Sequence, residues 1–375
     1  MKSMKKLVLV GLVLLASVMV LVGCDTNAGD TPKSANNALP LTIKDANGNS
    51  MSVTLEDTDS DGFYEIGTAD ELYAFAAAVN DKGLLTINGK LTSSIVVNET
   101  VLDEQGKISE NVTFRSWTPI GTNDYKYTGT FDGAGYTISG LYFDNTNAGY
   151  AGLFGYLGKG GSVQNLGVLD SYFCGGKYVG GVVGQNRGTV SNCYNTGAVS
   201  GTATGEDSYC DVGGVVGQNY EGAVTNCYNT GAVSGTGTNC DVGGVVGDNY
   251  DAVSNCYNTG AVSGTGTNCK VGGVVGENSS AVSTCYNEGA VRGTGTNCKV
   301  GGVVGENSGD VSNCYYLSGT AERGVDAGEG DAEVKDKTFF ASEEMATLLN
   351  ANQEDGPWEY ISGKPAPTLK AFNEG

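Results

Sequence analysis

The sequence contains no histidine among its 375 residues. Serine–histidine–aspartate and cysteine–histidine catalysis both use an imidazole as the general base, and the HExxH zinc peptidase motif uses two as metal ligands. The absence of histidine therefore excludes these three classes of enzyme. Proline is also scarce, with 6 residues, whereas glycine is abundant, with 60, about twice its usual share.

Basic residues are few as well. The 21 lysines and arginines are outnumbered by 42 aspartates and glutamates, so the formal net charge is −21. Such a chain repels the phosphates of nucleic acids and the anionic headgroups of lipids. We therefore expect no nucleic-acid partner, and the negative charge suits solubility, cation binding or a basic partner.

The only long apolar run lies at the amino terminus, where three lysines precede an uncharged stretch from Leu7 to Gly23. This layout is typical of a secretory signal peptide. The stretch ends in Leu21-Val22-Gly23-Cys24, which resembles the lipobox of bacterial lipoproteins. The resemblance implies a signal peptide over residues 1–23, whose removal takes away three lysines and leaves a charge of −24. It also implies that Cys24 is lipidated, so that acyl chains anchor the protein to a membrane. The alternative is an uncleaved membrane anchor.

Internal repeats dominate the rest of the chain. The hexapeptide VGGVVG occurs five times, at offsets of 33, 30, 29 and 29 residues, at 179–184, 212–217, 242–247, 271–276 and 300–305. Each copy leads through a polar turn into a second recurring segment, such as VSNCYNTGAVSG at 190–201. A period near 29 residues indicates a stacked array in which each unit buries its face on the next.

Short valine-rich segments separated by glycine favour strands over helices in every repeat. We therefore predict an all-β fold, a parallel β-helix or β-solenoid with coils of about 29 residues and short helical caps. Equivalent residues of successive coils would lie about 4.8 Å apart, so identical side chains should form ladders. We expect an asparagine ladder and a tyrosine column, formed by Asn186, Asn219, Asn249, Asn278 and Asn307 and by Tyr194, Tyr228, Tyr257, Tyr286 and Tyr315.

The repeat consensus V-G-G-V-V-G-x-N-x-x-x-V-S-N-C-Y-N-T-G-A-V-S-G resembles the GLUG-motif repeat of bacterial surface proteins. The lead-in, WTPIG at 117–121 and GTFDGAGYTISGL at 129–141, is typical of what precedes such arrays. The resemblance covers about residues 60–370. It implies an adhesin-like β-helical surface module and supplies no catalytic residues. GLUG repeats also occur in the non-catalytic part of immunoglobulin-A-cleaving metallopeptidases, whose zinc motif is absent here.

The flanks of the array have a different composition. Residues 24–40 are small and polar, which favours a flexible tether after the lipidated cysteine. Residues 41–110 should form amino-terminal strands and a capping helix from about Ala69 to Asn80, because Thr68 and Glu71 match a capping box. We place the solenoid at 111–320. Residues 321–375 should form an acidic loop, a short helix and a carboxy-terminal cap, since the open sheet edges of a solenoid need covering.

A candidate metal site lies in the segment DTDSDG at 57–62. Alternating carboxylates followed by a turn glycine match the first half of an EF-hand loop, and hard oxygen ligands suit Ca²⁺. The twelfth position is Thr68 instead of the usual glutamate, so Glu65 or Asp70 would have to replace that ligand. We keep Asp57, Asp59 and Asp61 as a candidate calcium site; the alternative is an acidic surface turn.

Ten cysteines follow Cys24, and each coil holds one before VGG and one in the NCY segment. An exported protein meets conditions that permit disulfides. Pairing within each coil would join Cys174 to Cys193, Cys210 to Cys227, Cys240 to Cys256, Cys269 to Cys285 and Cys298 to Cys314. We favour the alternative of two ladders of buried thiols, because cysteine packs as a small hydrophobe and recurs where a solenoid places its core. Metal ligation by clustered cysteines is the third alternative.

The residues that follow the asparagine ladder vary from coil to coil. Repeat proteins bind ligands through variable side chains on one face, and Arg187, Tyr220 and Tyr250 mark such a face here. The alternative at each position is drift at a solvated turn.

Together these features favour an exported, lipid-anchored, surface-exposed binding module of the adhesin kind and not an enzyme. Its partner would be a host or envelope protein or glycan, and no cofactor is implied beyond calcium. One alternative is a structural cell-envelope spacer without a specific ligand. Another is a carboxylate-dependent polysaccharide-active enzyme, which would need a pair of carboxylates within about 10 Å in a groove.

Overall fold

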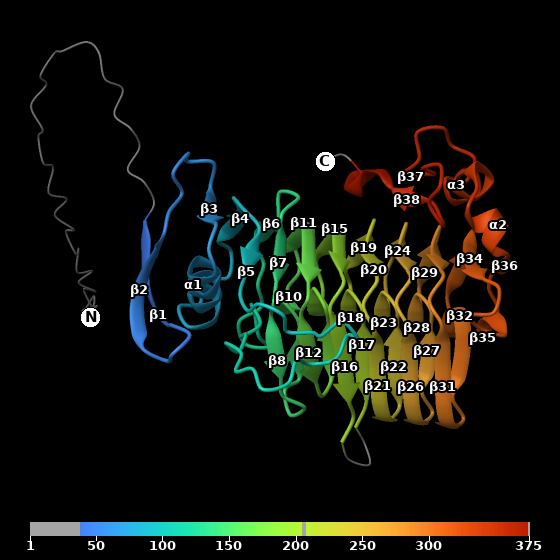
Figure 1. The fold of residues 1–375 in the computed structure, drawn as a ribbon, viewed down its shortest axis with the longest axis horizontal. Helices are drawn as coiled ribbons and strands as arrows, with labels where there is room; N and C mark the ends of the chain where they lie inside the picture. Colours follow the sequence, from blue (N-terminus) through green and yellow to red (C-terminus); the bar gives the residue numbers. More distant parts are fainter. Residues whose placement is uncertain (1–37, 205–207, 374–375) are drawn as a thin grey trace, which may run out of the picture. The chain divides into compact units, whose positions relative to one another are not determined.

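The computed structural model describes residues 38–204 and 208–373. An antiparallel hairpin of β1 (Leu39–Lys44) and β2 (Ser50–Leu55) is followed by a parallel β-solenoid of about nine turns (Figure 1). The predicted all-β solenoid with coils of about 29 residues is therefore confirmed. The predicted signal peptide, Cys24 and the tether up to residue 37 lie outside the described residues. In the described part of the chain, no helix has the length and hydropathy needed to cross a membrane.

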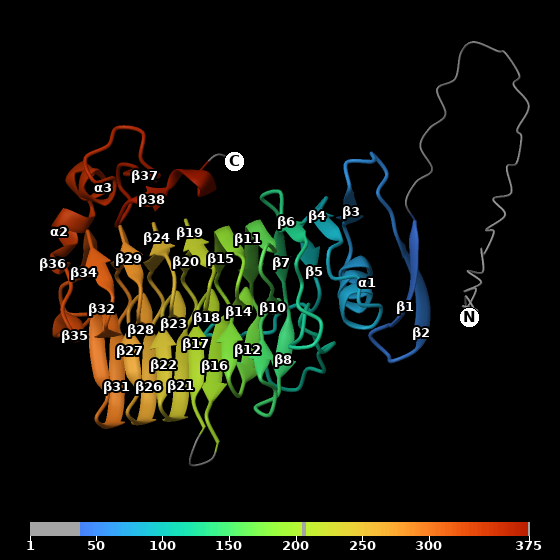
Figure 2. The same cartoon turned by 180° about the vertical axis from the view of Figure 1, so that it is seen from behind.

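The solenoid begins well before residue 111, where the repeats alone had placed it. β3 (Phe63–Ile66) pairs in parallel with β4 (Asn88–Leu91), and β4 pairs with β6 (Thr130–Asp132). Between β3 and β4 the chain forms α1 (Ala69–Asn80), with the predicted capping box between Thr68 and Glu71. Figures 1 and 2 show α1 at the amino-terminal end of the stack, where Phe75 packs on Phe131 with ring centroids 5.5 Å apart. The helix thus covers the first coil, as predicted.

The described coils present three walls, each built from parallel strands of successive coils. The first wall contains the VGGVVG segments, which bend between two short strands. Its strands are β9 (Tyr150–Ala151), β10 (Phe154–Leu157), β13 (Tyr178–Gly180), β14 (Val183–Asn186), β17 (Cys210–Gly213), β18 (Val216–Asn219), β22 (Cys240–Gly243), β23 (Val246–Asn249), β27 (Lys270–Gly272), β28 (Val275–Asn278), β32 (Lys299–Asn307) and β35 (Arg323–Ala327).

The second wall carries the NCY segments and contains β3, β4 and β6. Its other strands are β5 (Ile95–Val96), β7 (Thr137–Ser139), β11 (Ser162–Leu169), β15 (Thr189–Asn195), β19 (Ala223–Thr225), β20 (Tyr228–Asn229), β24 (Val253–Ser254), β25 (Tyr257–Asn258), β29 (Ala281–Ser283), β30 (Tyr286–Asn287), β33 (Asp310–Ser312), β34 (Cys314–Leu317) and β36 (Ala332–Lys335). The third wall is formed by β8 (Tyr142–Asp144), β12 (Tyr172–Gly175), β16 (Ala198–Thr202), β21 (Val233–Thr238), β26 (Val262–Thr267) and β31 (Val291–Thr296).

Both predicted ladders are present. The side-chain amides from Asn186 to Asn307 donate from coil to coil over 2.7–2.8 Å. The rings of Tyr194, Tyr228, Tyr257 and Tyr286 stack with centroids 4.7–4.9 Å apart and interplanar angles of 5–8°, and Tyr315 continues the register. A second asparagine ladder, which the sequence analysis missed, runs through Asn195, Asn229, Asn258 and Asn287 at 2.9 Å. Buried amides therefore bind successive repeat coils in two ladders, of which the second ends at Asn287 because its next register partner is Tyr316.

The carboxy-terminal segment differs from the prediction in two ways. The expected acidic loop instead contributes β35 and β36, which pair with β32 and β34 and extend the solenoid. The rest, comprising α2 (Lys337–Phe340), α3 (Glu343–Leu349), β37 (Trp358–Glu359), β38 (Thr368–Leu369) and the 3₁₀ helix Lys370–Phe372, runs back along the second wall (Figure 1). There it covers the tyrosine column: Trp358 packs against Tyr257 and Tyr286, and Phe372 against Tyr194 and Tyr228.

Replacing Asn249 by alanine tests the contribution of the first asparagine ladder. Asn249 is fully buried, its Nδ2 donates to Asn278, and its Oδ1 accepts from Nδ2 of Asn219. The substitution leaves both neighbours without that partner, so we expect a loss of about 2–4 kcal/mol in the free energy of unfolding. Chemical denaturation followed by circular dichroism measures it. The control Thr236→Ala, on the exposed side of β21, should change stability by less than about 0.5 kcal/mol, and equal losses would contradict the role of the ladder.

Candidate functional site

Two rows of side chains face each other across the bend of the first wall. One row precedes each VGG and the other follows each VVG, so facing residues are seven apart in the five VGGVVG coils and six apart in the shorter copy before them, Tyr150 to Tyr156. Gln218 Nε2 donates to Asp211 Oδ2 at 3.0 Å, and Lys299 Nζ lies 3.4 Å from Glu306 Oε1. We call this surface the paired-row face. Its first row is Tyr150, Tyr178, Asp211, Asp241, Lys270 and Lys299, and its second is Tyr156, Gln185, Gln218, Asp248, Glu277 and Glu306.

The amino-terminal end of the paired-row face is aromatic. The rings of Tyr150 and Tyr156 stack with centroids 5.5 Å apart, and the ring of Tyr178 lies 5.3 Å from that of Tyr150. Tyr209 joins them, because its hydroxyl lies 2.6 Å from the Tyr178 hydroxyl and Lys177 Nζ lies 5.0 and 4.6 Å from the two ring centroids. Sequence reasoning missed these tyrosines, although Tyr150 and Tyr178 each directly precede a copy of the repeat.

The structure brings together the three residues predicted as a binding face. The Arg187 guanidinium lies 4.6 Å from the Tyr220 ring centroid, and the rings of Tyr220 and Tyr250 meet edge to face at 5.4 Å. Tyr220 and Tyr250 are 36% and 45% exposed. Arg187 also forms an ion pair with Glu221 at 3.6 Å, and its backbone N–H donates to the carbonyl of Leu157, next to Tyr156, at 2.8 Å. The predicted face therefore adjoins the aromatic end of the paired-row face, and we call the two together the tyrosine patch.

Three carboxylates gather in the middle of the paired-row face. Asp211, Asp241 and Asp248 are 1%, 7% and 4% exposed, and one ligand oxygen from each lies within 4.8 Å of the other two. Burial, together with repulsion from the neighbouring acids, raises the pKa of the Asp211 and Asp241 carboxyls well above the usual range of aspartate. The same causes raise the pKa of Asp248 to about 6. The sequence alone does not single out these acids, because the facing of residues seven positions apart depends on the bend of the wall.

The predicted calcium residues also lie close together. Asp57 is 4% exposed and its Oδ1 has no hydrogen-bond partner within the described structure, while one oxygen each of Asp57, Asp59 and Asp61 lie within 4.8 Å of one another. Glu65 and Asp70, the suggested replacements for the twelfth ligand, form hydrogen bonds with other residues. The Glu65 carboxylate accepts from the backbone and hydroxyl of Thr58, and Asp70 Oδ1 accepts from Arg115 Nη1 at 2.7 Å. The loop therefore supplies three carboxylates from one side.

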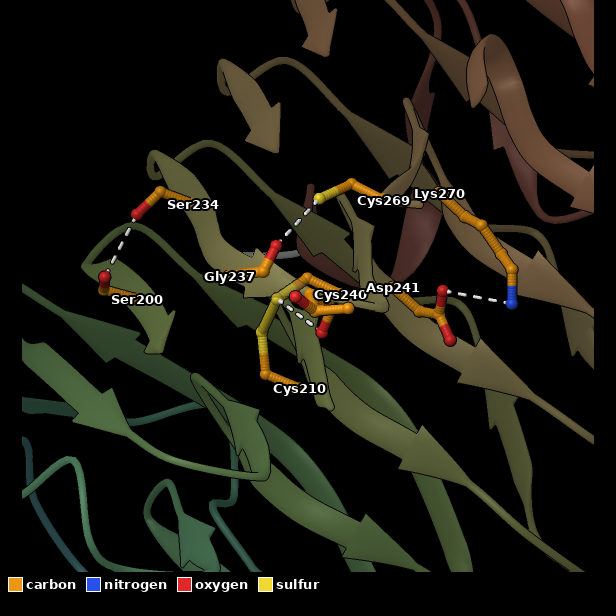
Figure 3. The surroundings of a disulfide bond; sticks show 9 residues. Ser200, Cys210, Ser234, Gly237, Cys240, Asp241, Cys269 and Lys270 are labelled. Carbon is orange, nitrogen blue, oxygen red and sulfur yellow. Dashed lines mark hydrogen bonds and ion pairs between the residues drawn. A yellow bond between two sulfur atoms is a disulfide. The ribbon is translucent and has the colours of Figure 1, made fainter. Parts of the chain in front are cut away.

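The cysteines do not pair within coils. Cys210 and Cys240 are register partners in adjacent coils, with Cα atoms 4.6 Å apart, and they form a disulfide (Figure 3). The other proposed partners, Cys227, Cys256, Cys269, Cys285, Cys298 and Cys314, together with Cys174 and Cys193, are free thiols. The within-coil pairs are wrong because the two cysteines of a coil belong to different walls.

The free thiols mostly match the favoured alternative. Cys193, Cys227, Cys256, Cys285 and Cys314 form a buried ladder along the second wall, and burial raises the pKa of Cys193, Cys256 and Cys314. Cys174 departs from the predicted ladder of the first wall. It lies on β12 in the third wall, where it aligns with Ser200.

The repeats of this chain are similar to sequences of known proteins. The GLUG motif matches residues 175–200 and 208–234. The chain is 42% identical over 95 residues to halomucin of Haloquadratum walsbyi, a match covering 25% of the chain and 1% of halomucin. It is 37% identical over 79 residues to a candidate Gly-rich membrane protein of Evansella cellulosilytica, covering 20% of the chain and 9% of that protein. The chain thus carries GLUG repeats and matches only small parts of these relatives.

A solved structure shares the fold. The crystal structure of a candidate immunoglobulin A1 protease from Bacteroides ovatus superimposes with a TM-score of 0.61 and 21% identity, covering 82% of this chain and 92% of that one. At this identity the likeness shows the solenoid fold alone.

The calcium loop can be tested by replacing Asp59, which contributes a carboxylate without forming an ion pair in the structure. We expect Asp59→Ala to remove one equivalent of bound calcium, measured by isothermal titration calorimetry, because the loop then keeps only two carboxylates. The control is Asp45→Ala, since Asp45 also accepts backbone hydrogen bonds in a turn and belongs to neither group of clustered carboxylates that the described residues form. Equal calcium binding by both variants and the parent would identify the loop as an acidic surface turn.

Proposed function

We propose that this chain is an exported, lipid-anchored surface protein that displays its solenoid as an adhesin-like binding module. Cys24 carries the lipid in this proposal, and the residues between Cys24 and β1 tether the solenoid to the membrane. The signal-like start of the sequence supports export. The similarity to halomucin and to a protein named as a membrane protein agrees with a place at the cell surface.

The observation that carries the proposal is the tyrosine patch. Tyrosine and arginine dominate the binding energy of protein interfaces, because a rigid ring provides a large contact area at a low cost in conformational entropy. Here the Tyr220 ring contacts both Arg187 and Tyr250 at the surface, and beside them the half-buried Tyr150 stacks on the buried ring of Tyr156. The six tyrosines of the patch come from four successive coils, and Tyr220 and Tyr250 are the exposed members.

A cavity of 380 Å³ adjoins this patch and is lined by Lys177, Tyr209 and small polar residues including Asn147 and Thr202. Its volume falls within the range of small-ligand sites, about 300–1,000 Å³. Hydroxyl and amide groups beside aromatic rings suit a sugar or a polar peptide side chain. The patch and the cavity together support binding of a glycan or a protein segment.

The two alternatives fit the structure less well. A spacer without a ligand needs no contacting pair of exposed tyrosines such as Tyr220 and Tyr250. A polysaccharide-active enzyme needs accessible carboxylates, and Asp211, Asp241 and Asp248 do lie close together. Their exposed fractions of 1%, 7% and 4% leave no room for a sugar to reach them. We therefore propose binding without catalysis.

A glycan and host-protein array probed with soluble protein from Asp25 onward tests the proposal. We expect saturable binding that falls at least tenfold when Tyr220 and Tyr250 are both replaced by alanine, because the patch loses two exposed rings. Tyr136→Ala is the matched control, since Tyr136 is 40% exposed and lies outside the patch. An array without any bound ligand would favour the envelope spacer, and equal losses in both variants would remove the patch as the binding site.

A further inference from the structure

The charges on the paired-row face are balanced differently in successive coils. Where the first row holds lysine, the facing acid has its own cation: Lys270 forms an ion pair with Glu277, and Lys299 with Glu306 at 3.4 Å. Where the first row holds Asp241, the facing residue is Asp248, so both positions are acidic. Asp211 in the preceding coil adds a third carboxylate. The same pair of positions is therefore neutral in two coils and doubly negative in one.

The neighbouring groups of the described structure do not neutralise this acidic coil. Lys270 Nζ lies 3.4 Å from Asp241 Oδ1 (Figure 3), but it also pairs with Glu277 and lies 3.8 Å from Glu306. Among the described residues, Oδ1 of Asp248 is buried without a hydrogen-bond donor, and Oδ1 of Asp241 has as its cation only the Lys270 ammonium that it shares with two glutamates. Burying carboxylates without a compensating cation is costly. The acidic cluster therefore lacks a positive charge of its own at the position that lysine holds in the next two coils.

We propose that Asp211, Asp241 and Asp248 bind a divalent cation, calcium, in the place that a lysine ammonium occupies in the next two coils. Three oxygens no more than 4.8 Å apart lie at most about 2.8 Å from a central ion, close to the usual calcium–oxygen distance of about 2.3–2.6 Å. Hard carboxylate oxygens are the ligands that calcium prefers. This site lies outside the calcium loop and goes beyond the proposed binding function.

Gln218 holds the carboxylates in position for the ion. Its Nε2 donates to Asp211 Oδ2 at 3.0 Å and to Asp248 Oδ2 at 3.1 Å, and its Oε1 accepts from Gln185 Nε2 at 2.6 Å. One oxygen of Asp211 and one of Asp248 are thus fixed by an amide, and Asp248 Oδ1 remains free to bind the ion. Such outer contacts orient metal ligands in proteins.

Calorimetric titration of the mature chain with calcium alone tests the proposal. We expect Asp248→Asn to lose one equivalent of bound calcium while keeping the hydrogen bond from Gln218. Asp241→Lys should also lose it, because the lysine recreates the neutral pair of the next coil. This variant should in addition unfold at a higher temperature than the parent when calcium is absent. Asp59→Ala, which affects the separate loop, should keep this equivalent and so distinguishes the two sites.

The proposal is overturned if the parent, Asp248→Asn and Asp241→Lys bind the same number of calcium ions. It is also overturned if the parent binds no calcium beyond the equivalent that Asp59→Ala removes, which would leave shared protons as the source of neutralisation. The two variants differ in charge and size, so a folding failure of Asp241→Lys still leaves Asp248→Asn to decide. The array experiment on the tyrosine patch is independent of either outcome.

Discussion

The fold depends on the coil-to-coil register that buried asparagine amides impose. Each amide of the ladders from Asn186 and Asn195 donates to the same residue one coil later, so every interior member is both a donor and an acceptor. A shift of one residue would turn these polar groups to the opposite face and the core valines outwards. Because an unsatisfied buried amide costs about 1–3 kcal/mol, such a shift is strongly disfavoured. The glycines act in the same direction: a side chain at Gly243 would overlap the carbonyl oxygen of Val246.

This constraint on the interior leaves the outward positions free to differ. The first row of the paired-row face changes from tyrosine to aspartate to lysine along successive coils, although the valines beside it do not change. Each coil adds one position to a row whose spacing the backbone fixes. The protein thus obtains an aromatic surface, an acidic cluster and a series of ion pairs on one wall from nearly identical repeats.

The sequence predicted those features that follow from periodicity alone. The period near 29 residues gave the solenoid, the ladder of Asn249 and the column of Tyr257, and the capping box gave α1. Features that depend on how the chain bends within one coil were missed. The second asparagine ladder lies in the same repeats, but strand alternation does not show whether Asn229 faces inwards. The bend of VGGVVG brings Asp241 opposite Asp248, and nothing in their separation of seven residues indicates this. Cys174 was misplaced because its distance from VGG differs from that of Cys210.

The two aromatic columns of the solenoid have different environments, and this difference bears on where a partner binds. The column on the second wall is covered by the chain's own carboxy-terminal segment: the Tyr286 hydroxyl donates to the carbonyl of Pro367 at 2.7 Å, and Trp358 and Phe340 pack on its ring. Exposed aromatic stacks are rare on soluble proteins unless they bind something, and here one stack has an intramolecular cover. In the tyrosine patch on the first wall, Tyr156 and Tyr178 are buried as well, but Tyr220 and Tyr250 remain 36% and 45% exposed. The fold therefore leaves uncovered the aromatic surface whose side chains vary between coils, which is the property expected of a surface that recognises an external partner.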